Sequence, residues 1–294
     1  MAELGKRRGS PMNRGGLHAG LLGLALGLLA AAFATPTLAQ GVAIPNFWDP
    51  RARQERPDLS GLRTVRFLTD DDFPPLHFVG PDGAPTGFSV ELARAACERL
   101  AITCTIQVRR FDTLADALSE ARGDVIAAAM PITPELRRRF SATLPYFRFP
   151  ARFAVRADKG QPEPAPRALE GRSVAVVQGT AHEAYVKAFF SRATVRGFDS
   201  LVAAEAALRR GEADYVFGDG LGLSLWIGGT DAAGCCGFIG GPYLESRFFG
   251  EGIGFVVRKD DELLRRALDH ALQRLWDEGK YAELYLRFFP VSPF

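Results

Sequence analysis

The stretch Gly123–Arg156 reads GDVIAAAMPITPELRRRFSATLPYFRFPARFAVR, and it decides the fold that we expect for this chain. Its apolar start, Val125–Met130, predicts a strand that ends at Pro131. Residues 133–135, Thr-Pro-Glu, then predict a helix start, because Thr caps helices, Pro is tolerated at the first helical position and Glu complements the helix dipole. A strand that leads into a helix N-terminus is suited to hold an anionic ligand group.

Composition narrows the class of protein. The 294 residues are 47% hydrophobic and 24% charged, which is typical of a globular chain long enough for two medium-sized domains. The net charge of +2 is too small to indicate nucleic acid as a partner, and the basic residues are scattered apart from Arg137–Arg139.

The N-terminus has the pattern of a secretory signal. Basic residues between Lys6 and Arg14 precede the apolar run Leu21–Phe33, and small residues follow at a cleavage position before Gln40. We therefore expect residues 1–39 to be a signal peptide that directs export and is cleaved before Gln40. A membrane anchor is the alternative, although the apolar run is short for a span. Residues 40–61 are rich in Pro and irregular, which predicts an extension that is draped over the surface or disordered.

The remaining chain shows one pattern twice. Strands alternate with helices from residue 64 to 130 and again from residue 173 to 217, which predicts two α/β units with mostly parallel sheets. The predicted strands are 64–68, 104–108, 125–130, 173–177, 194–198, 214–217 and 252–258, and the predicted helices are 90–100, 113–121, 181–190, 201–209, 260–278 and 280–288. Residues 77–88 predict a hairpin, and residues 220–250 are Gly-rich with a weak pattern.

Two apolar strands that end in Arg, Phe153–Arg156 and Phe255–Arg258, can carry the chain from one unit to the other and back. We therefore expect two lobes joined by two crossing hinge strands, with the ligand site between the lobes. The first lobe would contain residues 62–152 and 257–294, and the second residues 153–256.

The four cysteines are compatible with export, which permits disulfides. A bridge between Cys97 and Cys104 would join the end of a helix to the next strand, while Cys235 and Cys236 are adjacent. Four cysteines allow three pairings, and the sequence does not choose among them. Metal binding is the alternative, but the histidines lie at no ligand spacing from the cysteines, so we expect no metal.

Six motifs in order resemble the periplasmic solute-binding proteins of polar amino acid transporters, extracellular family 3. They are DFPPLHFVGPDGAPTGFSVELARAACERL, FDTLADALSEARGDVIAAAMPITPE, LPYF, LEGRSVAVVQGTA, ALRRGEADYVFGDG and GEGIGFVVRKDDELLRRALDHALQRLWDEGKYAELYLRFF. Together they cover about residues 62–290. The resemblance implies a two-lobed binding protein without cofactor or catalytic residues. Its implied partners are a small polar solute, an amino acid or analogue, and an inner-membrane ABC permease. A monomer is expected, and the resemblance also implies a disulfide between Cys97 and Cys104.

The resemblance implies a set of ligand residues. Aromatic rings would stack on the ligand, strand ends and helix starts would receive its carboxylate, and an acid would bind its ammonium group. These residues are Phe73, Phe111, Ala128, Ala129, Met130, Thr133, Gly179, Thr180 and Asp219. Simpler roles are open for several of them: Thr133 and Thr180 can act only as helix caps, and the Phe side chains can be core residues.

One position departs from the family pattern. The family reads Thr-Pro-Glu-Arg, and its Arg clamps the ligand carboxylate, whereas this chain has Leu136 there. Arg137 follows, about 100° around the helix, and is the candidate replacement. The absence of this Arg puts generic amino acid binding in doubt. Two alternatives are an accessory or sensory module of another periplasmic system and a cyclohexadienyl dehydratase-like enzyme, with Asp219 or Glu135 as the general acid.

Overall fold

The structure is a computed structural model, and it describes residues 43–49, 51, 57–61 and 64–294. The predicted signal peptide, residues 1–39, lies outside the described residues. Among the helices of the described part, none combines the length and the apolar character that a membrane crossing requires.

The first of two five-stranded sheets has the order β5-β1-β6-β13-β7. Its strands are β1 (Thr64–Thr69), β5 (Thr103–Val108), β6 (Val125–Ile126), β7 (Phe140–Ala142) and β13 (Val256–Arg258). β1 pairs in parallel with both β5 and β6, so the carboxyl ends of these three strands meet at one edge. β13 and β7 add antiparallel strands at the other side. We call the part of the chain that carries this sheet lobe one.

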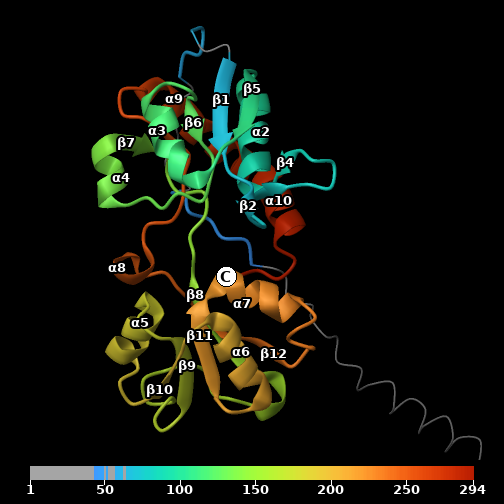
Figure 1. Cartoon of the computed structure of the whole chain (residues 1–294), viewed down its shortest axis with the longest axis vertical. Helices are drawn as coiled ribbons and strands as arrows, with labels where there is room; N and C mark the ends of the chain where they lie inside the picture. The colour runs from blue at the N-terminus through green and yellow to red at the C-terminus, as the bar shows by residue number, and fades with distance from the viewer. Residues whose placement is uncertain (1–42, 50, 52–56, 62–63) are drawn as a thin grey trace, which may run out of the picture. The chain divides into compact units, whose positions relative to one another are not determined.

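Helices cover both faces of this sheet, as Figure 1 shows for α2, α3 and α9 around β1 and β6. One face packs against α2 (Phe88–Leu100), α9 (Glu262–Asp277) and α10 (Lys280–Phe288). The other packs against α3 (Leu114–Ser119), which follows the short 3-10 helix η2 (Phe111–Thr113), and against α4 (Pro134–Arg139). The core residues on the two faces alternate along each strand, because successive side chains of a strand point to opposite faces.

The second sheet has the order β10-β9-β11-β8-β12 and defines lobe two. Its strands are β8 (Ala151–Arg156), β9 (Ser173–Val177), β10 (Thr194–Phe198), β11 (Tyr215–Asp219) and β12 (Cys236–Tyr243). One face packs against α5 (Ala181–Phe189) and α8 (Ser246–Phe249), and the other against α6 (Leu201–Arg210) and α7 (Gly220–Gly228). Phe153 and Ala154 of β8 illustrate the alternation, since each belongs to a different face.

Two segments connect the sheets. The chain leaves lobe one after β7, and it returns between β12 and β13 (Figure 1). The two segments pair with each other: the Ile253 N–H donates to the Phe147 carbonyl at 2.8 Å, and the Tyr146 N–H donates to the Ile253 carbonyl at 3.0 Å. Gly252 has φ +106°, and a Cβ there would lie 2.4 Å from the Phe147 carbonyl oxygen. Only glycine therefore permits this close pairing of the two connecting segments.

The predicted elements are largely confirmed, with three corrections. The strand predicted at 125–130 ends at Ile126, because the Met130 N–H turns back to the Ala128 carbonyl at 2.7 Å and the chain leaves the ladder. The weakly patterned region 220–250 contains α7, β12 and α8. The strand predicted at 252–258 begins only at Val256, because the residues before it form the connecting segment.

A small three-stranded sheet confirms the predicted hairpin. β3 (His77–Val79) pairs with β4 (Pro85–Thr86) and with β2 (Asp72–Phe73), both in antiparallel fashion. The structure joins Cys97 to Cys104, from α2 to β5, and joins the neighbours Cys235 and Cys236 at the start of β12.

The extension carries a buried anchor, contrary to our expectation of a surface or disordered segment. Trp48 is only 6% exposed and belongs to the core of lobe one. Its ring centroid lies 5.2 Å from that of Tyr281 and 5.7 Å from that of Trp276. The sequence around it is Pro-rich and irregular, and Trp48 is buried against side chains of both α9 and α10.

The buried carboxyl group of Glu205 is expected to make the free energy of unfolding depend on pH. Glu205 is a buried residue of α6, and burial together with the charge of Asp231 raises its pKa to about 7. The native state therefore holds a proton that the unfolded chain has lost, so stability falls as the pH rises from about 4.5 to 7. We expect Glu205→Gln to raise the free energy of unfolding by about 2 kcal/mol at pH 8 and to change it little at about pH 4.5. Urea unfolding at both pH values measures this, and an equal effect at both would contradict it.

Candidate ligand site

The carboxyl ends of three strands in lobe one define the candidate site. The Arg109 N–H donates to the Thr69 carbonyl at 2.8 Å, and the Ala127 N–H donates to the Leu68 carbonyl at 2.8 Å. The ends of β5, β1 and β6 thus lie next to one another. Ligands of α/β sheets bind at such an edge, because the loops that leave it diverge around a crevice.

Phe73 lies on this edge with two aromatic neighbours. Its side chain is 40% exposed, and its ring centroid lies 5.6 Å from that of His77 and 6.4 Å from that of Phe149. An exposed ring in contact with other rings is available to stack on a ligand. Phe149, in the first connecting segment, was not among the residues that we predicted, although it follows Tyr146 in an aromatic-rich run.

His77 is buried beside the predicted carboxylate contacts. Its Nε2 accepts the N–H of Ala129 at 2.9 Å, and its Nδ1 lies 2.9 Å from Oδ1 of Asp70. Burial lowers the pKa of His77, so the ring is neutral and its Nε2 is an acceptor, with the ring proton on Nδ1 facing Asp70. Burial raises the pKa of Asp70. The ring therefore uses the N–H of Ala129, which we had predicted to bind the ligand.

The backbone donors of residues 130–132 are also unavailable. The Met130 N–H donates to the Ala128 carbonyl, the Ile132 N–H donates to the Gly252 carbonyl at 2.9 Å, and Pro131 has no N–H. Met130 is itself buried. The amide groups of residues 129, 130 and 132 thus serve the fold.

Thr133 is the N-cap of α4, as its sequence predicts. Its Oγ1 accepts the N–H of Leu136 at 3.1 Å. The Leu136 side chain packs against the apolar cluster under α3 and α4. Leu136 therefore stabilises lobe one at the position where the family has its Arg.

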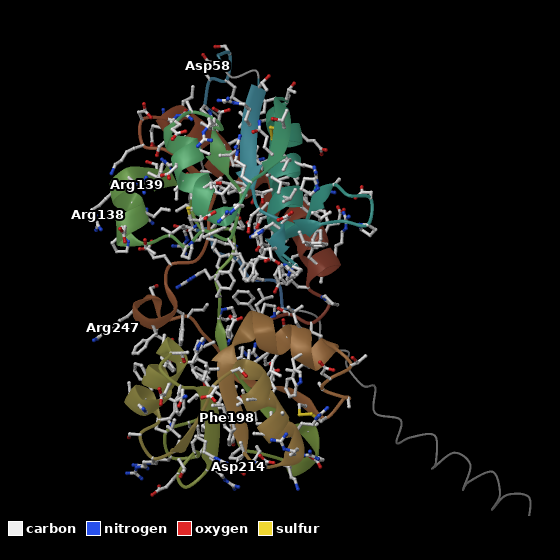
Figure 2. The ribbon with its side chains drawn as sticks, in the orientation of Figure 1. Asp58, Arg138, Arg139, Phe198, Asp214 and Arg247 are labelled. Atoms are coloured by element: carbon white, nitrogen blue, oxygen red, sulfur yellow. A yellow bond between two sulfur atoms is a disulfide. The ribbon has the colours of Figure 1, made fainter. Side chains whose placement is uncertain are left out.

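Arg137 is engaged by an acid. Its Nη2 lies 2.6 Å from Oε2 of Glu251 in the returning segment, and Lys259 donates to its carbonyl at 2.7 Å. Both side chains of the pair are about half exposed. Arg138 and Arg139 lie at the outer edge of α4 in Figure 2. The guanidinium of Arg137 is therefore directed to the connecting segment by this pair.

Phe111 and Arg109 follow β5. Phe111 opens the short helix η2 with 45% of its side chain exposed. Arg109, between it and the strand, has a buried Nε without a hydrogen-bond partner. The ring neighbours of Phe73 among the described residues are His77 and Phe149, and Phe111 is not one of them.

In lobe two, Gly179 and Thr180 begin α5. The Gly179 N–H donates to Oε2 of Glu183 at 2.7 Å, and Thr180 Oγ1 accepts the Glu183 N–H at 3.4 Å while donating to the Val177 carbonyl at 2.7 Å. This confirms the predicted capping of the helix by Thr180. The Glu183 carboxylate occupies the place at this helix start where an anion would be favourable.

Asp219 ends β11 and caps α7. Its Oδ2 accepts the Gly222 N–H at 2.9 Å, and burial raises its pKa. The Gly220 N–H donates to the carbonyl of Pro150 at 2.7 Å, so Asp219 lies directly beside the residue that follows Phe149. No cationic side chain of the described residues forms an ion pair with it.

Two further observations concern metal binding and a separate cavity. Within the described part of the chain, no group of three or more His, Cys, Asp or Glu side chains is placed to hold a metal ion. A cavity of about 730 Å³ lies elsewhere, between residues 43–49 and the connecting segments, and none of the predicted ligand residues lines it.

The fold and the site define a two-lobed solute-binding protein of the periplasmic type. Residues 65–291 match the bacterial extracellular solute-binding proteins, family 3, and the chain belongs to that family.

Two curated relatives are similar over most of their length. The chain is 30% identical over 230 residues to the "Putative ABC transporter arginine-binding protein 2" of Escherichia coli, covering 78% of this chain and 92% of the relative. It is also 30% identical over 235 residues to the "L-arginine-binding protein" of Pseudomonas aeruginosa, covering 79% and 90%.

The L-cystine solute receptor of Neisseria gonorrhoeae, in an unliganded open conformation, has the same fold. The TM-score is 0.69 at 21% identity, over 79% of this chain and 94% of that one. Both curated relatives are named as arginine-binding proteins, the first of them of an ABC transporter, and this chain is a binding protein rather than an enzyme.

Proposed function

We propose that this protein captures a small polar solute, an amino acid or an analogue, between its lobes in the periplasm and delivers it to an inner-membrane ABC permease. The observation that carries the proposal is the continuity from Phe73 through Phe149 and Pro150 to Asp219. This chain of contacts joins the ligand edge of lobe one to an acid of lobe two. Movement about the two paired segments would close the site over the solute, as in other hinged binding proteins.

The same proposal assigns the remaining predicted residues. Phe111 and Thr180 would contribute to the walls of the site, and residues 1–39 would direct export before cleavage at Gln40. N-terminal sequencing of the exported protein tests the cleavage. We propose a monomer. Its lobe boundaries move by one or two residues from those expected, because β8, from Ala151, belongs to the sheet of lobe two and β13, from Val256, belongs to the sheet of lobe one.

A thermal-shift screen of amino acids, amines and small carboxylates tests the binding function. A solute at about 100 times its dissociation constant stabilises the native state by about 2.7 kcal/mol. For a chain of this size we expect the melting temperature to rise by about 5–10 °C. A folded protein whose melting temperature responds to no solute of any class would contradict the proposal.

The alternative function is an accessory or sensory module, and two features motivate it: the Pro-rich extension at residues 41–60 and Leu136 at the position where the resemblance implies an Arg. In the structure Trp48 of this extension is buried in the core of lobe one, which does not favour an extension that is free to bind a partner.

A further inference from the structure

We infer that the solute is an amine without a carboxylate beside its ammonium group, such as the amine formed by decarboxylation of an amino acid. The inference rests on the proposed solute-binding function and narrows it. It follows from the hydrogen-bond donors and charges at two places. One is the edge of lobe one, and the other comprises the starts of α5 and α7 in lobe two.

Residues 129–132 of the turn after β6 offer no spare amide to a carboxylate. The N–H of Ala129 is bound by His77, those of Met130 and Ile132 are bound by carbonyl groups, and Pro131 has none. A carboxylate placed against residues 129–132 would lose its water and gain no backbone donor from them. Burial of an ionised carboxylate without donors is strongly unfavourable.

The cations near this turn are committed as well. The apolar side chain of Leu136 packs against the apolar cluster and supplies no charge. Arg137 is held by Glu251 at 2.6 Å, and Lys259 is held by the carbonyl of Arg137. A carboxylate would have to break the ion pair of Arg137 before it could use this guanidinium.

The helix start in lobe two is occupied from within the chain. Glu183 places its carboxylate on the N–H of Gly179 and also pairs with Lys187 at 2.7 Å. A second carboxylate at the start of α5 would meet this charge. Like charges at one site are unfavourable, so the position favours a ligand without an anionic group.

The groups that remain at the site favour a cation. Asp219 is an acid without an ion-pair partner in the described part of the chain, and Asp71 and Asp72 are exposed beside Phe73. An ammonium or guanidinium group can bind an acid and at the same time lie on the face of an aromatic ring such as Phe73. Acid and ring together therefore match an amine.

Arg109 is a cation that would favour a ligand carboxylate, and its substitution therefore provides a test of the inference. It lies on the same edge, and its Nε is buried without a partner. If Arg109 received a carboxylate, the amino acid would bind better than the amine, and Arg109→Gln would abolish that advantage. If the inference is correct, Arg109→Gln leaves the preference for the amine in place.

Isothermal titration calorimetry on the mature protein tests the inference with matched pairs: agmatine against arginine, cadaverine against lysine and histamine against histidine. We expect one amine to bind at least about tenfold more tightly than its amino acid, because the carboxylate finds no donor. Thermal shifts measured in parallel report whether each protein sample is folded.

Each other outcome has a distinct meaning. An amino acid that binds as tightly as its amine, or more tightly, overturns the inference and leaves the proposed function intact. The same holds if only neutral or anionic solutes bind. If a folded protein binds no solute of any class, both the inference and the proposed function fail.

Discussion

Asp219→Asn is expected to weaken solute binding by about 30-fold or more, because removal of one partner of a buried charged pair costs about 2–5 kcal/mol and about 1.4 kcal/mol corresponds to tenfold. The substitution keeps the shape of the side chain and its capping oxygen, which accepts the Gly222 N–H. Asn and Asp cap helices about equally well, so we expect little change in stability. Calorimetry with the solute found in the screen, together with thermal unfolding, separates the two effects.

Asp261→Asn is the matched control. Asp261 caps α9 through the Leu264 N–H at 3.3 Å and lies outside the candidate site. We expect it to leave affinity unchanged. Burial raises the pKa of Asp219, so affinity of the unaltered protein for a cation should fall as the pH drops through that pKa. Equal affinities for the unaltered protein and Asp219→Asn would rule out the ligand role of Asp219.

Trp48→Ala is expected to lower the free energy of unfolding by about 3–5 kcal/mol, the usual cost of removing a large buried ring. The ring is buried between Trp276 and Tyr281, and its loss would leave a cavity between the extension and α10. Urea unfolding measures the change.

Two control variants accompany the prediction for Trp48→Ala. Trp48→Phe keeps an aromatic side chain and should lose clearly less stability than Trp48→Ala. Val202→Ala removes a side chain that is 73% exposed and should change stability by less than about 0.5 kcal/mol. If Trp48→Ala unfolds at the same urea concentration as Val202→Ala, the extension is not an anchor of the fold.

Local patterns predicted most of the elements well. The helices 181–190 and 201–209 and the strand 173–177 were expected within about one residue, since their caps and periodicity are local properties. The strand at 125–130 was predicted too long, because its end depends on bonds to other segments.

The ligand site was harder to predict than the fold. Thr180 was expected to cap its helix and does so, because the capping box lies within four residues. His77 and Ala129 are 52 positions apart, and no local signal indicates that one binds the other. The missing N–H of Pro131 was visible in the sequence, but its importance appears only when the neighbouring donors are seen to be engaged.

The sequence by itself determined the repeated α/β pattern, the family resemblance and the replacement of Arg by Leu136. Only the tertiary structure decided that Arg137 is held by Glu251, that His77 takes the Ala129 amide and that Trp48 is a core residue. Each of these contacts joins residues far apart in the chain. Periodicity and capping arise from neighbours within one or two turns, whereas the partner of a donor or a charge depends on which segments the folded chain brings together.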